Sequence, residues 1–180
     1  AWLNDRVVAR TLAVAIRDAL AGLLGVQANE LGCEIKDSKV EDGSLCKSIL
    51  VFDHFAAGYS SRAEDSIEEL FHISANHLNC PSNCDSACPK CVLDYDQRFA
   101  VDALDRKKAL SFLSPTWLDK LKLPVEYAFF GSSRSWLEPK PLTEAIWNTV
   151  VKGNVHKIKL YAGGDAANWD IGISPIRTLA

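Results

Sequence analysis

Four cysteines within twelve residues constrain this chain more than any other feature of its sequence. Cys80, Cys84, Cys88 and Cys91 follow the spacing C-x3-C-x3-C-x2-C, and they are four of the six cysteines present. The residues between them are mostly proline, asparagine, serine and aspartate, which cannot form an apolar core. Zn²⁺ binds four thiolates in a tetrahedron at about 2.3 Å. The cluster therefore predicts a closed, structural Zn²⁺ site with no position left for a substrate water.

Other uses of clustered thiols remain as alternatives. Disulfides are typical of secreted chains with cysteines spread along the sequence; the sequence indicates neither a leader nor such a spread, so we do not expect them. An iron–sulfur cluster also takes four thiolates, and Cys84-x3-Cys88-x2-Cys91 repeats the spacing of radical-SAM enzymes. Those enzymes build a large barrel, for which the 89 residues after Cys91 are too few. A redox pair at Cys88 and Cys91 would leave the other two thiols unexplained.

The composition places the chain among globular proteins. It has 180 residues, 48% of them hydrophobic and 24% charged, with a net charge of −3. This charge is not that of a polybasic nucleic-acid arm, so any DNA contact would come from a local patch. No apolar run approaches the ~20 residues that span a bilayer, and we expect a cytoplasmic location and no membrane partner. Because methionine is absent and Ala1 is the first residue, we expect a piece of a larger protein.

Hydrophobic periodicity predicts an α+β fold before and after the cysteines. Residues 5–24 form a predicted helix, and residues 31–36 and 46–53 form predicted strands, the second buried on both faces. Ser61 and Glu64 have the spacing of a capping box that starts a helix leading into Cys80. Further predicted elements are a helix capped by Asp102, with Leu104, Ala109, Leu110 and Leu113 facing inward, and a short helix with Pro115 at its first position.

After Leu123 a new alternation of predicted strands and helices begins, which predicts a second unit. Residues 125–130 favour a strand, 142–153 a helix and 156–162 a further strand. We therefore expect one domain over residues 1–123, a small sheet flanked by helices with a four-cysteine zinc loop. Residues 124–180 are expected to open a separate α/β unit of no family that the sequence indicates.

Nothing in the sequence forms a catalytic set. A phosphate-binding loop, a zinc-protease motif and a nucleophile elbow are all missing, so whether the chain is an enzyme stays open. Basic residues follow the cysteines, and they could contact nucleic-acid phosphates beside the metal: Arg98, Arg106, Lys107 and Lys108. The alternative is a solvated helix face, in which Arg106 pairs with Asp102 or Asp105. Lys90 and Arg98 are the side chains expected beside the sulfurs.

Several segments together resemble one known family. They are "LAGLLGVQANELG", "ILVFDHFAAGYSSRAED", the cysteine cluster and "CVLDYDQRFAVDALDRKKAL". Over about residues 5–113 the chain resembles the MrfA-type zinc-binding domain of bacterial and fungal superfamily-two DNA helicases. Related copies occur in helicase-like proteins of the DISARM and Druantia antiphage systems. The resemblance implies that the four cysteines bind zinc. The sequence departs from the family pattern at Ala56 and Ala57, which stand where family members have consecutive glycines before Gly58.

The resemblance also implies a role. We expect a zinc-stabilised accessory domain of an ATP-dependent DNA helicase or translocase, in DNA repair or antiphage defence. Its partners would be single-stranded DNA or a duplex junction, reached through the parent protein, and the helicase motor domains or a partner subunit. The alternative is a protein–protein interaction module of a defence complex without DNA binding of its own. ATPase activity would belong to the parent protein, because no motor motif is present in this sequence.

Overall fold

The computed structural model of this chain describes residues 3–93, 101–128, 142–153 and 157. The chain divides into two compact units, Ala1–Ser135 and Trp136–Ala180, and each is described by itself. The domain boundary predicted after residue 123 stays a prediction. Within the described residues the fold is α+β: one two-stranded antiparallel sheet and several helices, as the sequence predicts.

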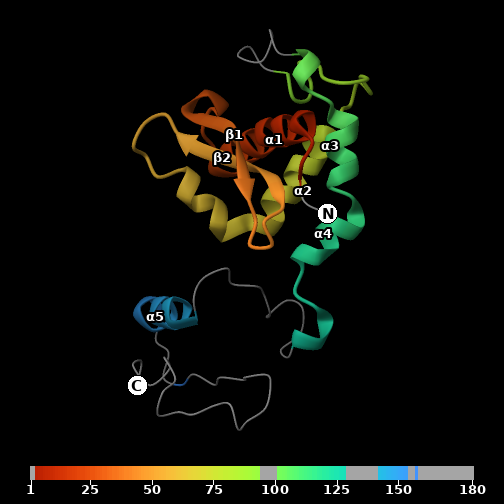
Figure 1. Cartoon of the computed structure of the whole chain (residues 1–180). Coiled ribbons are helices and arrows are strands. Elements are labelled where there is room, and N and C mark those ends of the chain that lie inside the picture. The colour runs from red at the N-terminus through yellow and green to blue at the C-terminus, as the bar shows by residue number, and fades with distance from the viewer. Residues whose placement is uncertain (1–2, 94–100, 129–141, 154–156, 158–180) are drawn as a thin grey trace. The chain divides into compact units, whose positions relative to one another are not determined.

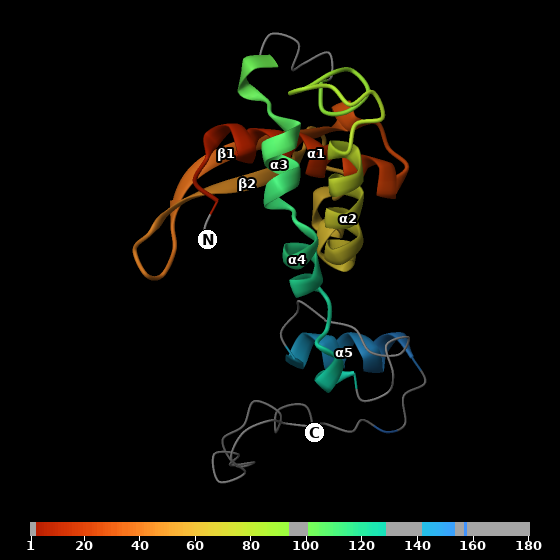
Figure 2. The same cartoon turned by 90° about the vertical axis from the view of Figure 1, so that its right-hand side faces the viewer.

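Helix α1, Arg6–Leu24, is the central element of the first unit. Asp5 caps its start by accepting hydrogen bonds from the backbone N–H of Val7 at 2.8 Å and of Val8 at 3.1 Å. Gly25 ends it in the left-handed conformation, with φ of +69°. The helix contacts both strands, α2 and α3 (Figures 1 and 2). The predicted helix over residues 5–24 is confirmed.

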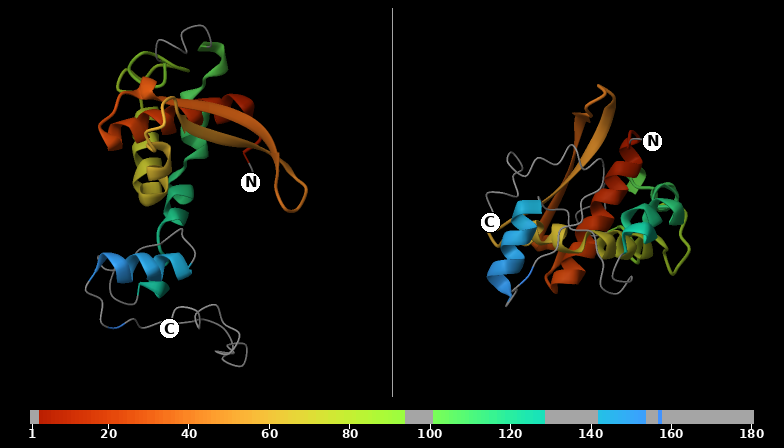
Figure 3. Two further views of the ribbon diagram at one scale, coloured as in Figure 1. Left: turned by 90° about the vertical axis from the view of Figure 1, so that its left-hand side faces the viewer. Right: turned by 90° about the horizontal axis from the view of Figure 1, so that it is seen from below.

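Strands β1, Leu31–Lys39, and β2, Leu45–Asp53, form an antiparallel hairpin in which Cys33 pairs with Val51. Leu31 and Cys33 are buried in the core that α1 lines, in keeping with the alternation in the sequence. Figure 3 shows the tip of the hairpin reaching away from the helices. Both predicted strands are confirmed.

The prediction that the second strand is buried on both faces is wrong. Leu50 is 37% exposed and Phe52 is 40% exposed, both on the face opposite the core. The sheet has two strands and its inner face contacts α1, so the apolar run has nothing to bury its outer side within the described residues. The Phe52 ring lies across Gly32 instead, where an added Cβ would come within 2.3 Å of it. Glycine therefore makes room for the ring.

Helix α2, Ile67–Leu78, starts later than predicted. Ser61 and Glu64 lie in the 3-10 helix η2, Ser60–Ser66, so the capping-box prediction is wrong. The Asp53 carboxylate accepts hydrogen bonds from the backbone N–H groups of Tyr59 and Ser60, each at 2.7 Å. Burial opposes ionisation of Asp53, but these N–H groups outweigh it and hold its pKa below the ordinary value. A carboxylate on β2 thus shapes the turn that precedes α2.

Helix α3, Arg106–Phe112, is capped by Asp105, whose carboxylate accepts from the Lys108 N–H at 3.0 Å. The prediction of Asp102 as the cap is wrong, because Asp102 lies in the 3-10 helix η3, Val101–Ala103. Leu104, Ala109 and Leu113 are buried and Leu110 packs against them, as predicted. Helix α4, Pro115–Leu118, has its proline at the first position, which confirms that prediction. The described residues of the first unit also form the 3-10 helices η1 (Ala28–Glu30), η4 (Asp119–Leu121) and η5 (Val125–Tyr127).

The second unit contains α5, Leu142–Lys152, in agreement with the helix predicted over residues 142–153. The strand predicted over residues 125–130 is wrong at its start, since Val125–Tyr127 is η5. Its end, and the strand predicted over 156–162 apart from Lys157, lie outside the described residues. In the described part of the chain no helix has both the length and the hydropathy needed to cross a bilayer.

Candidate metal centre

The cysteine loop lies between two fully buried residues. Leu78, the last residue of α2, and Val92, just after the last cysteine, are both 0% exposed. Cys80 is 6% exposed, and the other three thiols are half-buried. The core therefore fixes both ends of the loop, while its middle lies outside the core.

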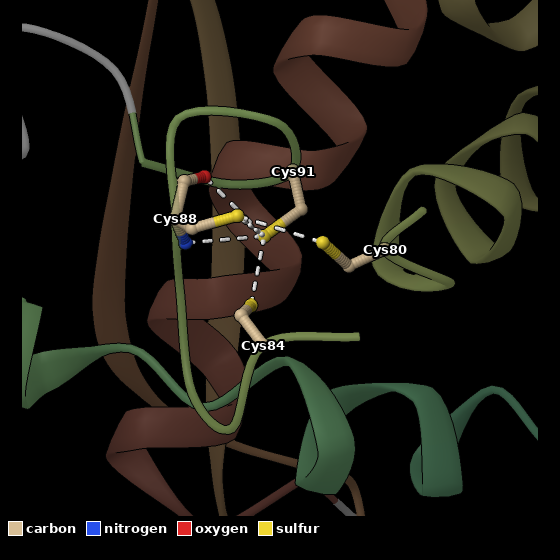
Figure 4. Close-up of side chains that lie close together, drawn as sticks. All are labelled: Cys80, Cys84, Cys88 and Cys91. Carbon is tan, nitrogen blue, oxygen red and sulfur yellow. Dashed lines mark hydrogen bonds between the residues drawn. The ribbon is translucent and has the colours of Figure 1, made fainter. Parts of the chain in front are cut away.

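The sulfur atoms converge on one point (Figure 4). The sulfurs of Cys80 and Cys88 lie 3.5 Å apart, those of Cys84 and Cys91 3.7 Å, and those of Cys88 and Cys91 3.8 Å. All four lie within 4.8 Å of one another, and no disulfide joins them. Four sulfurs at about 2.3 Å from one tetrahedral ion stand about 3.8 Å apart. The spacing in this structure fits a single Zn²⁺ held by all four thiolates.

Two local turns bring the sulfurs together. Asn83 adopts a left-handed conformation, with φ of +47°, and its N–H donates to the Cys80 carbonyl at 2.9 Å. That turn reverses the chain between the first two cysteines. The second turn has the Cys91 N–H donating to the Cys88 carbonyl at 3.0 Å, while the Cys88 N–H faces the Cys91 sulfur at 3.3 Å. A backbone N–H group thus contacts a sulfur.

The environment makes the thiols unequal. The backbone N–H of Cys84, helped by that of Ser82, lowers the pKa of Cys80 to about 6. Burial raises the pKa of Cys91 to about 12. Burial also raises the pKa of Cys84, although the Arg106 guanidinium acts in the opposite direction. Because the thiolate is the form that binds metal, Cys80 is the thiol of these three most ready to capture a cation.

The basic residues predicted near the cysteines do not share one environment: some are exposed and one is buried. Arg106 is buried, with 4% of its surface exposed, and its guanidinium faces the cysteine loop rather than solvent. It pairs with neither Asp102 nor Asp105 among the described ion pairs. Arg98 lies outside the described residues. Lys90 is exposed, and the side chain that reaches a sulfur is Arg106, which the sequence pattern places in a surface patch.

Lys107 and Lys108 do lie on the surface of α3. Their side chains are 53% and 62% exposed. The Lys107 ammonium lies 2.7 Å from Asp85 of the cysteine loop, and the Lys108 ammonium lies 3.4 Å from Asp105. Both contacts are solvent-exposed ion pairs, which contribute little to stability and can open to accept another anion.

The fold and the site define a small α+β domain whose cysteine loop is organised around a structural Zn²⁺. Residues 12–92 match the family model of the MrfA Zn-binding domain. The family resemblance noted in the sequence is confirmed over these residues, a narrower span than 5–113. No curated protein and no solved structure matches the chain.

Proposed function

We propose that this chain is a zinc-stabilised accessory region of an ATP-dependent DNA helicase or translocase-like protein, acting in DNA repair or antiphage defence. The observation that carries the proposal is the match of residues 12–92 to the MrfA Zn-binding domain, together with the gathered cysteines. Cys80, Cys84, Cys88 and Cys91 would be the ligands. With four protein donors the ion supplies folding free energy and no reaction chemistry.

In this proposal the first unit holds single-stranded DNA or a duplex junction near the motor. Lys107 and Lys108 support a nucleic-acid contact, because they are exposed on α3 next to the cysteine loop. Lysines in such positions contact phosphates, which fixes the position of the protein without reading the sequence. On binding, Lys107 and Lys108 would leave the carboxylates of Asp85 and Asp105 and contact phosphate oxygens instead.

The second candidate is a module that braces the motor domains or a partner subunit without binding DNA. It is favoured by Leu50 and Phe52 on the outer face of β2, exposed by 37% and 40%, and by Phe55 in the loop that follows, exposed by 75%. The net charge of −3 is also compatible with a protein partner. Exposed apolar side chains are typical of protein contacts where they form one patch.

A salt-dependent titration separates the two candidates. Binding of the full chain to fluorescently labelled single-stranded and forked DNA is measured by anisotropy over a range of salt concentrations. Replacing Lys107 and Lys108 together by glutamine should weaken binding and reduce the slope of log K against log salt by about 1.4, or about 0.7 for each lost phosphate contact on a single strand. The matched control replaces Lys120 of η4 and Lys122, the residue after η4, which are both exposed.

The control variant should keep the wild-type slope. Absence of any salt-dependent binding by the zinc-loaded wild type would refute DNA contact and leave the bracing role. Equal losses in both double variants would refute the assignment to α3, because they would indicate a diffuse effect of charge.

A further inference from the structure

A buried arginine is bound to the cysteine loop at several points. The Arg106 guanidinium donates hydrogen bonds to the carbonyl oxygens of Cys84 at 2.7 Å and Leu78 at 3.2 Å. It also donates to the Asn83 side-chain oxygen at 2.9 Å and approaches the Cys84 sulfur at 3.3 Å. One side chain therefore contacts the end of α2, the left-handed turn and one of the four sulfurs.

The charge of this arginine lacks a carboxylate partner within the described residues. Arg106 appears in none of the ion pairs found there. Its charge helps Lys107 to lower the pKa of Asp85, but the Asp85 side chain is 99% exposed and pairs with Lys107. A buried cation without a counter-charge is costly. Four thiolates around one Zn²⁺ carry a net charge of −2, which would supply the missing counter-charge at the sulfur of Cys84.

The backbone around Arg106 is fixed from two directions. The Arg106 N–H donates to the Ser86 carbonyl in the cysteine loop at 2.7 Å. The N–H of the preceding residue, Asp105, donates to the hydroxyl of Thr11 at 2.9 Å, and Thr11 is a fully buried residue of α1. The start of α3 is thus attached to the central helix on one side and to the loop on the other.

From these contacts we propose that Arg106 is a positioning residue of the zinc centre. Its guanidinium holds the loop in the shape that brings the sulfurs together, and its N–H on the Cys84 sulfur offsets the negative charge of the thiolate cluster. The functional metal-binding unit therefore includes the start of α3, beyond the family match that ends at Val92. This inference rests on the metal site and not on the proposed role in a helicase.

The test compares three variants of the full chain: Arg106→Gln, Arg106→Lys and the control Arg62→Gln. Arg62 is an arginine of η2 with a 66% exposed side chain and an ion pair to Asp65. Zinc affinity is measured by competition with a chromophoric chelator at fixed pH. In the same variants Co²⁺ replaces Zn²⁺, and the energy of the sulfur-to-cobalt charge-transfer bands is recorded, since it responds to hydrogen bonds on sulfur.

We expect Arg106→Gln to weaken zinc binding by about 10- to 100-fold, which is the usual effect of losing a residue that orients metal ligands. Its charge-transfer bands should shift while four-sulfur coordination is kept. Arg106→Lys should recover part of the affinity, because it retains the charge but not the forked geometry. Arg62→Gln should stay within about threefold of the wild type, with unchanged bands, as an exposed substitution does.

Wild-type affinity and wild-type bands in Arg106→Gln would overturn the proposal. If that variant fails to fold, Arg106→Lys decides: wild-type affinity and bands overturn the proposal, and weaker binding with displaced bands supports it. A loss in Arg106→Gln without any recovery in Arg106→Lys and without a band shift would overturn the electrostatic part. If the wild-type chain itself binds no zinc, the metal site fails, which is a different result from failure of the arginine.

Discussion

Replacing Asp105 by alanine tests how the start of α3 is held. The carboxylate accepts from the Lys108 N–H at 3.0 Å, and loss of such a cap costs about 1 kcal/mol, with a range of about 0.5–2 kcal/mol. The ion pair to the exposed Lys108 ammonium adds at most a few tenths of a kcal/mol. The backbone N–H to Thr11 survives the substitution. We therefore expect Asp105→Ala to lower the free energy of unfolding by about 1–2 kcal/mol.

The assay is urea unfolding of the zinc-loaded chain, followed by circular dichroism, at neutral pH. Asp102→Ala is the matched control, because Asp102 lies three residues earlier and caps nothing in this structure. It should change the free energy of unfolding by less than about 0.5 kcal/mol. Equal effects of the two substitutions, or no effect of Asp105→Ala, would refute the assignment of the cap.

The effect of Asp105→Ala should depend on pH. The Lys108 N–H, acting against burial, holds the pKa of Asp105 below its ordinary value of 3.8. A carboxylate with a depressed pKa in the folded state stabilises the fold above the ordinary value, and this contribution is lost as the pH falls through the folded value. The difference between wild type and Asp105→Ala should thus be full at pH 7 and shrink below about pH 4. A difference that grows on acidification would contradict this reasoning.

Two further substitutions test the metal and the core. Cys88→Ser should reduce bound zinc from about one ion per chain to a small fraction and lower the thermal midpoint. The control Cys46→Ser, on β2 outside the cluster, should keep the metal. Elemental analysis after dialysis measures the zinc content of both variants. Full zinc retention in Cys88→Ser would remove that cysteine from the ligand set. Thr11→Val should cost about 1–3 kcal/mol in urea unfolding, because the Asp105 N–H loses its buried acceptor. An unchanged midpoint would mean that this N–H finds another partner.

Local patterns in the sequence correctly predict the elements that depend on interactions between residues close together along the chain. The apolar spacing of α1, with Asp5 before it and Gly25 after it, is enough to place that helix. The four cysteines lie so close together along the chain that their spacing alone predicts a common site. Alternation from Leu31 to Ile35 likewise predicts a strand and its buried side.

Most of the errors occur where a distant residue decides the outcome, whereas the predicted cap of α3, Asp102, lies only three residues from the observed cap, Asp105. Ser61 and Glu64 have the right spacing for a capping box, but Asp53 has already taken the N–H groups of the preceding turn. A run of apolar residues in β2 cannot reveal that no layer covers its outer face in the described part of the chain. The role of Arg106 depends on contacts 22 to 28 residues away in sequence, and its basic neighbours give it the pattern of a surface stripe.

The hydrogen bond between Thr11 and Asp105 joins residues 94 positions apart. During synthesis at roughly 5–20 residues per second, the first helix leaves the ribosome about 5–20 s before the segment that completes its surroundings. The part of its apolar side that α3 covers stays exposed in that interval, after the hairpin and α2 have emerged, so the nascent chain is open to chaperones and to premature association. Because Arg106 contacts the cysteine loop, the loop can reach the shape seen in this structure only after the start of α3 has emerged, which places completion of the metal site late in synthesis.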